Sequence, residues 1–163
     1  MQKKHIHTEI EVYTDETELS SERLALLTKA KEAASGAYAP YSKFRVGAAV
    51  LLENGLIVLG SNQENAAYPS TMCAERNAIA AAASAYPNQK IIQIAITIVS
   101  PEGRIKTPVP PCGACRQVIF ESEYRYNNSI ELILQGDSGI VYVVGSIKDI
   151  LPLTFDATFL KID

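Results

Sequence analysis

The architecture of this chain can be predicted from residues 73–99, CAERNAIAAAASAYPNQKIIQIAITIV. Residues 73–86 of this stretch are rich in alanine and predict a helix, which Pro87 and Asn88 end. Residues 91–99 are mostly β-branched and apolar, which is typical of a strand in the centre of a sheet. A helix that leads into a central strand indicates a crossover connection, and therefore an α/β protein.

The segments on either side extend this pattern into layers. Further helices are expected at Ser21–Tyr38, Cys112–Glu121 and Ile147–Leu151. Further strands are expected at Val46–Leu52, Leu56–Gly60, 130–134 and 140–144. These strands form two pairs, and the turn within each pair contains glycine, which is typical of a hairpin. The sequence therefore predicts a three-layer α/β/α sandwich with a five-stranded mixed sheet.

Composition and charge narrow the possible functions. The chain has 163 residues, 47% of them hydrophobic and 20% charged, which predicts one globular domain rather than a disordered chain. The net charge is −3 and no basic stripe is visible, which argues against a general nucleic-acid binder. No apolar run is long enough for a membrane span, and the first residues do not resemble a secretory signal. We therefore expect a cytoplasmic protein without a membrane or nucleic-acid partner.

The domain boundary is expected just before the first predicted helix. Residues 1–19 are polar and acidic with little periodicity, so we predict that they form a flexible, solvated extension. His5 and His7 lie in this extension, where exposed side chains are a simpler interpretation than a weak metal site. Residues 20–163 are predicted to form the single folded domain.

The chain contains three cysteines, Cys73, Cys112 and Cys115, and this odd number argues against a disulfide framework. Cys112 and Cys115 are three positions apart, so on a helical turn they share one face. All three lie at predicted helix starts, where the helix dipole favours the thiolate. Three thiolates can occupy three corners of a zinc tetrahedron and leave the fourth for water, as in catalytic zinc sites. A redox pair, with Cys73 as a buried apolar residue, remains an alternative.

Glu75 follows Cys73 by two positions and is the candidate proton carrier. Residues two apart do not share a helix face, but at a helix start both can border one cavity. In an open zinc site the pKa of a bound water falls to roughly 7, and a neighbouring carboxylate can take and pass on its proton. The alternative for Glu75 is a carboxylate that stabilises the first turn of the helix.

These residues resemble the zinc-dependent cytidine deaminases of the small homotetrameric type with three cysteines. The signature of the wider superfamily, a ligand followed by x-E and then P-C-x-x-C, is present in TMCAERNAI (71–79) and PCGACRQV (111–118). Two other family blocks are similar to AYAPYSKFRVGAAV (37–50) and NQENAAY (62–68). The order and spacing of the blocks also match, and the resemblance covers residues 24–155. It implies a cytidine deaminase-like fold.

The resemblance assigns roles to individual residues. It implies that Cys73, Cys112 and Cys115 bind Zn²⁺, one ion per chain, and that Glu75 is the proton shuttle. It implies that Asn62 and Glu64 bind the ribose 3′-hydroxyl and that Phe44 packs on the pyrimidine ring. It also implies that the backbone amide of Ala74 meets O2 of the base and that Tyr68 lies in the binding loop. Without the resemblance, Phe44 would be interpreted as an ordinary core residue.

Arg76 and Phe155 complete the implied site. Three thiolates and one Zn²⁺ carry a net negative charge, which a guanidinium beside a sulfur can offset. Arg76 is placed to do this, and the alternative is an exposed surface arginine. Phe155 matches the phenylalanine that reaches the neighbouring subunit's site in tetrameric relatives. Leu153 and Thr154, however, stand where the family has smaller residues.

The implied function is the hydrolytic deamination of cytidine and 2′-deoxycytidine to uridine and 2′-deoxyuridine, with release of ammonia, in pyrimidine salvage. The implied partners are a small nucleoside substrate and further copies of the chain, in a homotetramer with shared active sites. Three alternatives remain at this point: a deaminase of a modified cytosine nucleoside such as blasticidin S, a non-enzymatic zinc-binding module, and a thiol oxidoreductase that uses Cys112 and Cys115.

Overall fold

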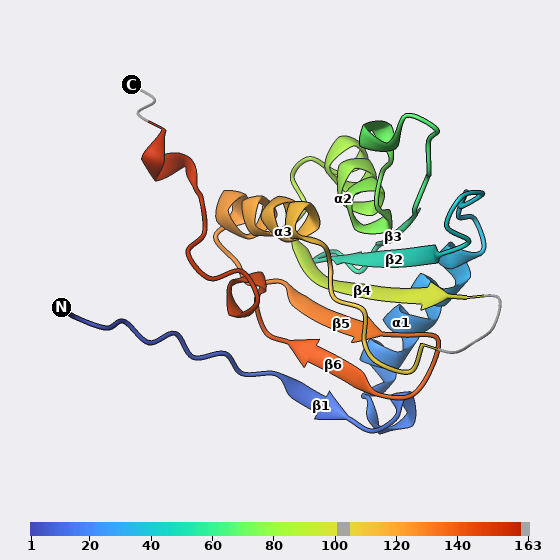
Figure 1. The fold of residues 1–163 in the computed structure, drawn as a ribbon, viewed down its shortest axis with the longest axis horizontal. Helices are drawn as coiled ribbons and strands as arrows, with labels where there is room; N and C mark the ends of the chain where they lie inside the picture. Colours follow the sequence, from blue (N-terminus) through green and yellow to red (C-terminus); the bar gives the residue numbers. More distant parts are fainter. Residues whose placement is uncertain (101–104, 161–163) are drawn as a thin grey trace.

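One mixed sheet of six strands forms the centre of the protein (Figure 1). The computed structural model describes residues 1–100 and 105–160. The strands are β1 (Glu11–Tyr13), β2 (Arg45–Leu52), β3 (Ile57–Ser61), β4 (Ile91–Val99), β5 (Glu131–Gln135) and β6 (Val141–Val144). Their spatial order is β1-β6-β5-β4-β2-β3. Strands β4 and β5 run parallel, and every other neighbouring pair is antiparallel.

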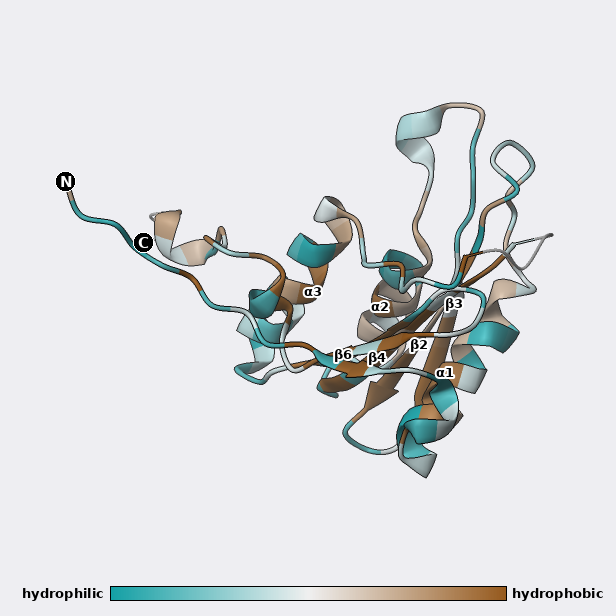
Figure 2. Ribbon diagram, turned by 60° about the horizontal axis from the view of Figure 1, so that its bottom comes forward, coloured by the Kyte–Doolittle hydropathy of each residue, from teal (hydrophilic) through white to brown (hydrophobic). Residues whose placement is uncertain are grey.

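In the described part of the chain, three α-helices cover the two faces of this sheet. They are α1 (Ser21–Ala34), α2 (Ala74–Ala85) and α3 (Gly113–Tyr126). On one face, α1 packs Leu27 and Ala30 against a cluster that includes Ala95 of β4. On the other face, α2 and α3 pack Ile79 and Phe120 against the remaining strand side chains. Figure 2 shows the apolar strands between α1 on one side and α2 and α3 on the other. The predicted α/β/α layering is therefore confirmed.

The predicted number of five strands is wrong, because β1 adds a sixth strand at the sheet edge. Residues 11–13 pair antiparallel with β6, although they belong to the segment 1–19 that the sequence predicts to be a flexible extension. Arg23 of α1 holds this strand, since its guanidinium donates to Glu11 at 3.0 Å and to the Tyr13 hydroxyl at 2.8 Å. The same guanidinium donates twice to Glu131 of β5. A strand of three residues carries too little periodicity to be predicted from the sequence.

Most other predicted elements are confirmed, and their ends differ for local reasons. Strand β4 is internal to the sheet, as expected. Helix α1 ends at Ala34 rather than at Tyr38, because Tyr38 leaves the helix and donates to the carbonyl of Asn62 at 3.0 Å. Helix α3 continues to Tyr126 and ends on Asn127, which adopts the left-handed conformation that asparagine tolerates. The last predicted helix is a short 3-10 turn, Ile147–Asp149. No helix in the described ranges is long and apolar enough to cross a membrane.

Gly60 of β3 allows α2 to lie directly on the sheet. A Cβ atom at this position would lie 2.4 Å from the Ala74 carbonyl oxygen and 2.5 Å from the Ala78 nitrogen. Both contacts are to backbone atoms, which cannot move aside as the end of a side chain can. We therefore expect Gly60→Ala to lower the free energy of unfolding by about 2–3 kcal/mol, as overpacked sites do.

Urea denaturation of the Gly60 variant and of Gly145→Ala measures this effect. A Cβ atom at Gly145 would meet nothing within 4 Å, so this control should be neutral or slightly more stable than the native chain. Equal stability of the two variants would contradict the close contact between α2 and β3.

Candidate active site

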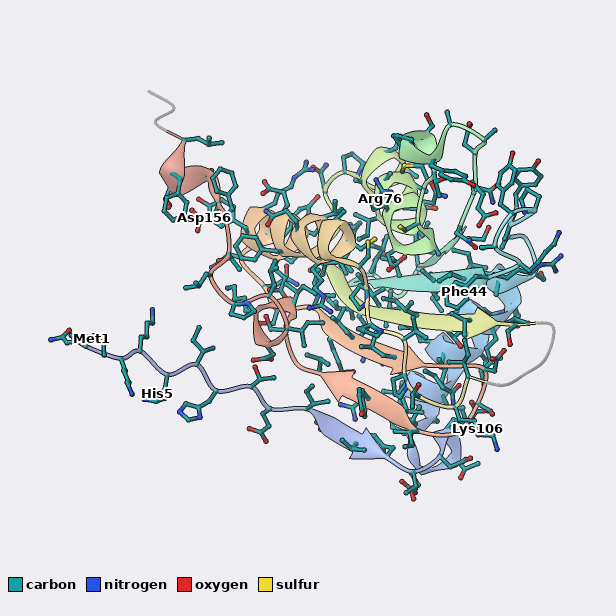
Figure 3. The ribbon with its side chains drawn as sticks, viewed as in Figure 1. Met1, His5, Phe44, Arg76, Lys106 and Asp156 are labelled. Atoms are coloured by element: carbon teal, nitrogen blue, oxygen red, sulfur yellow. The ribbon has the colours of Figure 1, made fainter. Side chains whose placement is uncertain are left out.

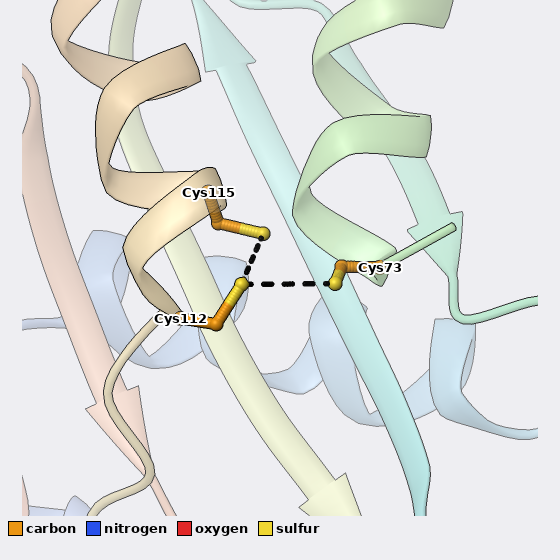
Figure 4. Close-up of side chains that lie close together, drawn as sticks. All are labelled: Cys73, Cys112 and Cys115. Atoms are coloured by element: carbon orange, nitrogen blue, oxygen red, sulfur yellow. Dashed lines mark hydrogen bonds between the residues drawn. The ribbon is translucent and has the colours of Figure 1, made fainter. Parts of the chain in front are cut away.

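The three cysteines converge from the starts of two helices. Cys73 caps the N-terminus of α2, Cys112 caps that of α3, and Cys115 lies in the first turn of α3. The sulfur atoms of Cys73 and Cys112 are 3.9 Å apart, and those of Cys112 and Cys115 are 3.4 Å apart (Figure 4). All three sulfurs lie within 4.8 Å of one another. The spacing in sequence is thus translated into one cluster, as predicted.

This cluster fits a zinc ion. Sulfur atoms bound to one tetrahedral Zn²⁺ at about 2.3 Å would lie roughly 3.8 Å apart, close to the observed spacing. The cysteines are free thiols in the structure, and Cys115 is buried while Cys112 is exposed. In the described part of the chain, this is the one group of three or more potential metal ligands. A redox pair of Cys112 and Cys115 would not require Cys73 to lie beside them.

Arg76 supplies a positive charge beside the cluster. Its Nη2 donates to the Thr71 carbonyl at 2.9 Å and lies 3.7 Å from the Cys73 sulfur. Figure 3 labels Arg76 on α2. A hydrogen bond from Cys115 and the contact with Arg76 lower the pKa of the Cys73 thiol, against the opposing effect of burial. The structure therefore places this arginine against a sulfur and not on an exposed turn.

Glu75 is a buried carboxyl next to the cysteines. Only 5% of the residue is exposed, and it lines the same cavity as Cys73 and Cys112. Burial raises the pKa of the Glu75 carboxyl, and the negative charge of the Cys73 thiolate raises it further. A carboxyl with a raised pKa accepts and releases a proton closer to neutral pH than an exposed one.

The cavity has a volume of about 470 Å³. It contains six residues predicted from the sequence: Phe44, Asn62, Glu64, Cys73, Glu75 and Cys112. It also contains six that the sequence analysis did not single out: Ser42, Val46, Thr71, Ile96, Val109 and Pro110. Most of these lie inside or next to the quoted motifs, and this proximity was the available signal for them. The cavity therefore joins the cysteine cluster to the two other sequence blocks.

Asn62 and Glu64 are held by the start of β2 and by the segment just before it. The buried Asn62 accepts from the Val46 amide at 2.8 Å and donates to the Phe44 carbonyl at 2.9 Å. Glu64 accepts from the Ser42 hydroxyl and from the amide of Tyr41 at 2.9 Å. The Ser42 hydroxyl is the main cause that lowers the pKa of the Glu64 carboxyl. Glu64 is therefore held as an anion at the cavity wall.

Besides Cys115 and Arg76, three other predicted residues lie outside this cavity lining. Tyr68 is 72% exposed and sits edge-on to Tyr41, with ring centroids 6.1 Å apart. Ala74 is buried at the first position of α2, where a backbone amide has no partner within its own helix. Phe155 is 55% exposed and stacks on Phe159, with centroids 5.7 Å apart.

The segment around Phe155 leaves the body of the protein. Figure 1 shows the C-terminal arm extending beyond α3, away from the other helices. Leu153 in this arm adopts the left-handed conformation at φ 58°, which is unfavourable for a leucine. Leu153, which stands where the family has a smaller residue, therefore occupies a backbone position that favours glycine.

Comparison with known proteins identifies the family. Residues 20–127 match the family model of the cytidine and deoxycytidylate deaminase zinc-binding region. The chain belongs to this family. The matched residues include all three cysteines, so the predicted resemblance and the zinc-binding character of the chain are confirmed.

Individual relatives agree with this assignment. The chain is 47% identical over 100 residues to a cytidine deaminase of Halalkalibacterium halodurans, a match that covers 61% of this chain and 71% of that one. It is 48% identical over 96 residues to a cytidine deaminase of Sporosarcina psychrophila, covering 59% and 66%. The crystal structure of cytidine deaminase from Burkholderia pseudomallei superposes with a TM-score of 0.71 at 37% identity. That match covers 84% of this chain and 100% of the other, which confirms a cytidine deaminase-like fold.

Proposed function

We propose that this chain hydrolyses cytidine and 2′-deoxycytidine to uridine and 2′-deoxyuridine and releases ammonia. The observation that carries the proposal is the position of Glu75, a buried carboxyl in the cavity that the cysteine cluster borders. The relatives named cytidine deaminases support the same substrate class. A cytoplasmic role in pyrimidine salvage is part of the proposal.

The metal would be held by Cys73, Cys112 and Cys115, and Arg76 would offset the excess negative charge. When bound in an open site, zinc acts as a Lewis acid that makes a water nucleophilic near neutral pH. A non-enzymatic zinc module would need a fourth protein ligand, and the cluster found in residues 1–100 and 105–160 contains three.

Glu75 would carry the protons of the reaction. It takes a proton from the attacking water and delivers it to N3 of the cytosine ring, which activates C4 for addition of the oxygen. It then passes the second proton of that water to the amino group at C4, and the C4–N bond breaks to release ammonia. The raised pKa of the Glu75 carboxyl suits a group that must both accept and donate.

The rest of the cavity would bind the nucleoside. The Phe44 ring would pack on the pyrimidine. The backbone amide of Ala74, which has no partner within its own helix, would donate to the base O2. Asn62 and Glu64 would bind the ribose 3′-hydroxyl, since each retains hydrogen-bonding capacity after its contacts within the chain. A substrate without this hydroxyl would leave polar groups unpaired. Tyr68 would lie in the loop that binds the substrate.

We further propose a homotetramer in which Phe155 contacts the neighbouring subunit's site. The exposed position of its ring, outside the cavity of its own chain, supports this arrangement. Light scattering combined with activity at dilution tests it. A fully active monomer would exclude shared sites.

A substrate panel with zinc quantified in the same sample tests the proposed function. We expect cytidine and 2′-deoxycytidine to lose ultraviolet absorbance, and cytosine, deoxycytidylate and blasticidin S to remain unchanged. Cytosine lacks the sugar that Asn62 and Glu64 would bind, which is the physical reason for its rejection. If blasticidin S is converted and cytidine is not, the alternative of a modified cytosine nucleoside as substrate is favoured instead.

A further inference from the structure

The turn before β2 faces Glu64 and has an unfavourable backbone conformation. Lys43, at its centre, lies in the left-handed region at φ 60°, which costs free energy in a residue with a β-carbon. Its amide donates to the Ala39 carbonyl at 3.1 Å. Additional contacts are needed to keep such a turn in one conformation. Those contacts come from Glu64 and from the neighbouring Ser42.

The Ser42 hydroxyl joins two residues of the proposed nucleoside site. It donates its hydrogen to Oε1 of Glu64 and accepts the amide hydrogen of Phe44 at 3.0 Å. The amides of Tyr41 and Ser42 both donate to Oε2 of Glu64, at 2.9 and 3.3 Å. One side chain thus connects the carboxylate proposed to bind the ribose with the aromatic residue proposed to pack on the base.

The free donors and acceptors of Ser42 and Glu64, which together form one wall of the cavity, determine what a substrate can bind there. A carboxylate has about four acceptor positions, and the turn fills three of those on Glu64. A serine hydroxyl has a single hydrogen, which Ser42 gives to Glu64. Ser42 and Glu64 both line the cavity, so their remaining capacity there is to accept. A substrate group must therefore donate a hydrogen to be bound at this wall.

We propose that Ser42 is a positioning residue, which orients Glu64 and so sets selectivity for a sugar with a free hydroxyl. A sugar that lacks this hydroxyl cannot fill the remaining acceptor position. A phosphorylated sugar brings a second anion against the Glu64 carboxylate, where Ser42 and Glu64 themselves offer only acceptors. The inference rests on the proposed function, because it takes the cavity to bind a cytosine nucleoside.

Steady-state kinetics of Ser42→Ala with cytidine, 3′-deoxycytidine and cytidine 3′-phosphate test this role. We expect KM for cytidine to rise about tenfold, because a hydrogen bond to a charged group is lost, while kcat stays within about twofold. KM for 3′-deoxycytidine should change less than about threefold, so the preference for cytidine falls. We expect no measurable conversion of cytidine 3′-phosphate by the native chain.

Three further variants separate positioning from a general structural effect. Ser42→Thr keeps the hydroxyl and should stay within about threefold of the native KM. In a Glu64→Ala background, Ser42→Ala should raise KM for cytidine by less than about twofold, because the two residues act as a unit. Ser35→Ala is the matched control, since its hydroxyl donates to the Glu32 carbonyl in α1, outside the cavity. Zinc content should match the native value in both Ser42 variants, and the thermal midpoint of Ser42→Ala should fall by no more than about 5 °C.

The outcomes distinguish this inference from the proposed function. A native chain that converts cytidine, with a Ser42→Ala variant of unchanged KM, would overturn the positioning role alone. An equal rise of KM for cytidine and 3′-deoxycytidine would overturn it as well. If Ser42→Ala does not fold, Ser42→Cys replaces it with the same expectations, because a thiol keeps the side chain but is only a weak donor. A native chain that converts no cytosine nucleoside would overturn both proposals.

Discussion

Glu75→Gln is expected to lower kcat for cytidine by about three to four powers of ten while zinc remains bound. The size follows from the proposed mechanism, in which Glu75 moves a proton at more than one step, and each such transfer contributes roughly two to four powers of ten. Glutamine has nearly the same shape but cannot accept or release a proton at the pH of the assay. Because Glu75 is placed beside the ligands and not among them, its replacement should leave the cysteine cluster intact.

Stopped assays of ammonia release, with zinc measured on the same protein, test this prediction. Glu121→Gln is the matched control, because Glu121 is exposed on α3 and does not line the active-site cavity. The control should retain native kcat, KM and zinc content. A Glu75→Gln variant with kcat within tenfold of the native value would exclude the shuttle role. A variant that loses zinc would instead assign Glu75 to metal binding.

Cys115→Ser is expected to abolish deamination because zinc is lost. Cys115 is buried in the first turn of α3, where its sulfur faces the other two, so its loss leaves two ligands for the ion. We expect zinc affinity to fall by at least about two powers of ten, since two protein ligands make a much weaker site than three. Serine keeps the size of the side chain, which limits the effect on packing.

Removal and return of the metal supply the control for this variant. A chelator should abolish the activity of the native chain, and added Zn²⁺ should restore it. The Cys115→Ser variant should remain inactive under the same zinc concentration. Activity that survives the chelator, together with a reversible disulfide between Cys112 and Cys115, would support the thiol oxidoreductase alternative.

The part of the site that could be predicted from the sequence consists of residues at helix starts and in short motifs. Cys112 and Cys115 share a helical turn, so their spacing alone predicts that their sulfurs meet. Cys73 is 39 positions from Cys112, and its approach depends on α2 and α3 covering the same face of the sheet. The order of strands and helices predicted the layers but not which helices share a face, so the approach of Cys73 was anticipated from the three helix starts and from the family resemblance.

The features that the sequence did not predict depend on distant partners. Strand β1 exists because Arg23 and β6 hold three residues that have no periodicity of their own. Ser42 is an ordinary loop serine until Glu64, 22 positions away, meets its hydroxyl. The burial of Glu75 likewise depends on how α2 packs on the sheet, and not on its place in C-A-E. Contacts of this kind are set by tertiary structure, and the neighbouring sequence does not identify the distant partner.

Zinc content and cytidine conversion measured in one purified sample test the proposed zinc-dependent deamination. We expect one zinc ion per chain, loss of ultraviolet absorbance on addition of cytidine, and one ammonia released for each uridine formed. The absorbance change and the ammonia release should disappear with the chelator and return with Zn²⁺. A sample that holds one zinc ion per chain and converts neither cytidine nor 2′-deoxycytidine would contradict the proposed deamination.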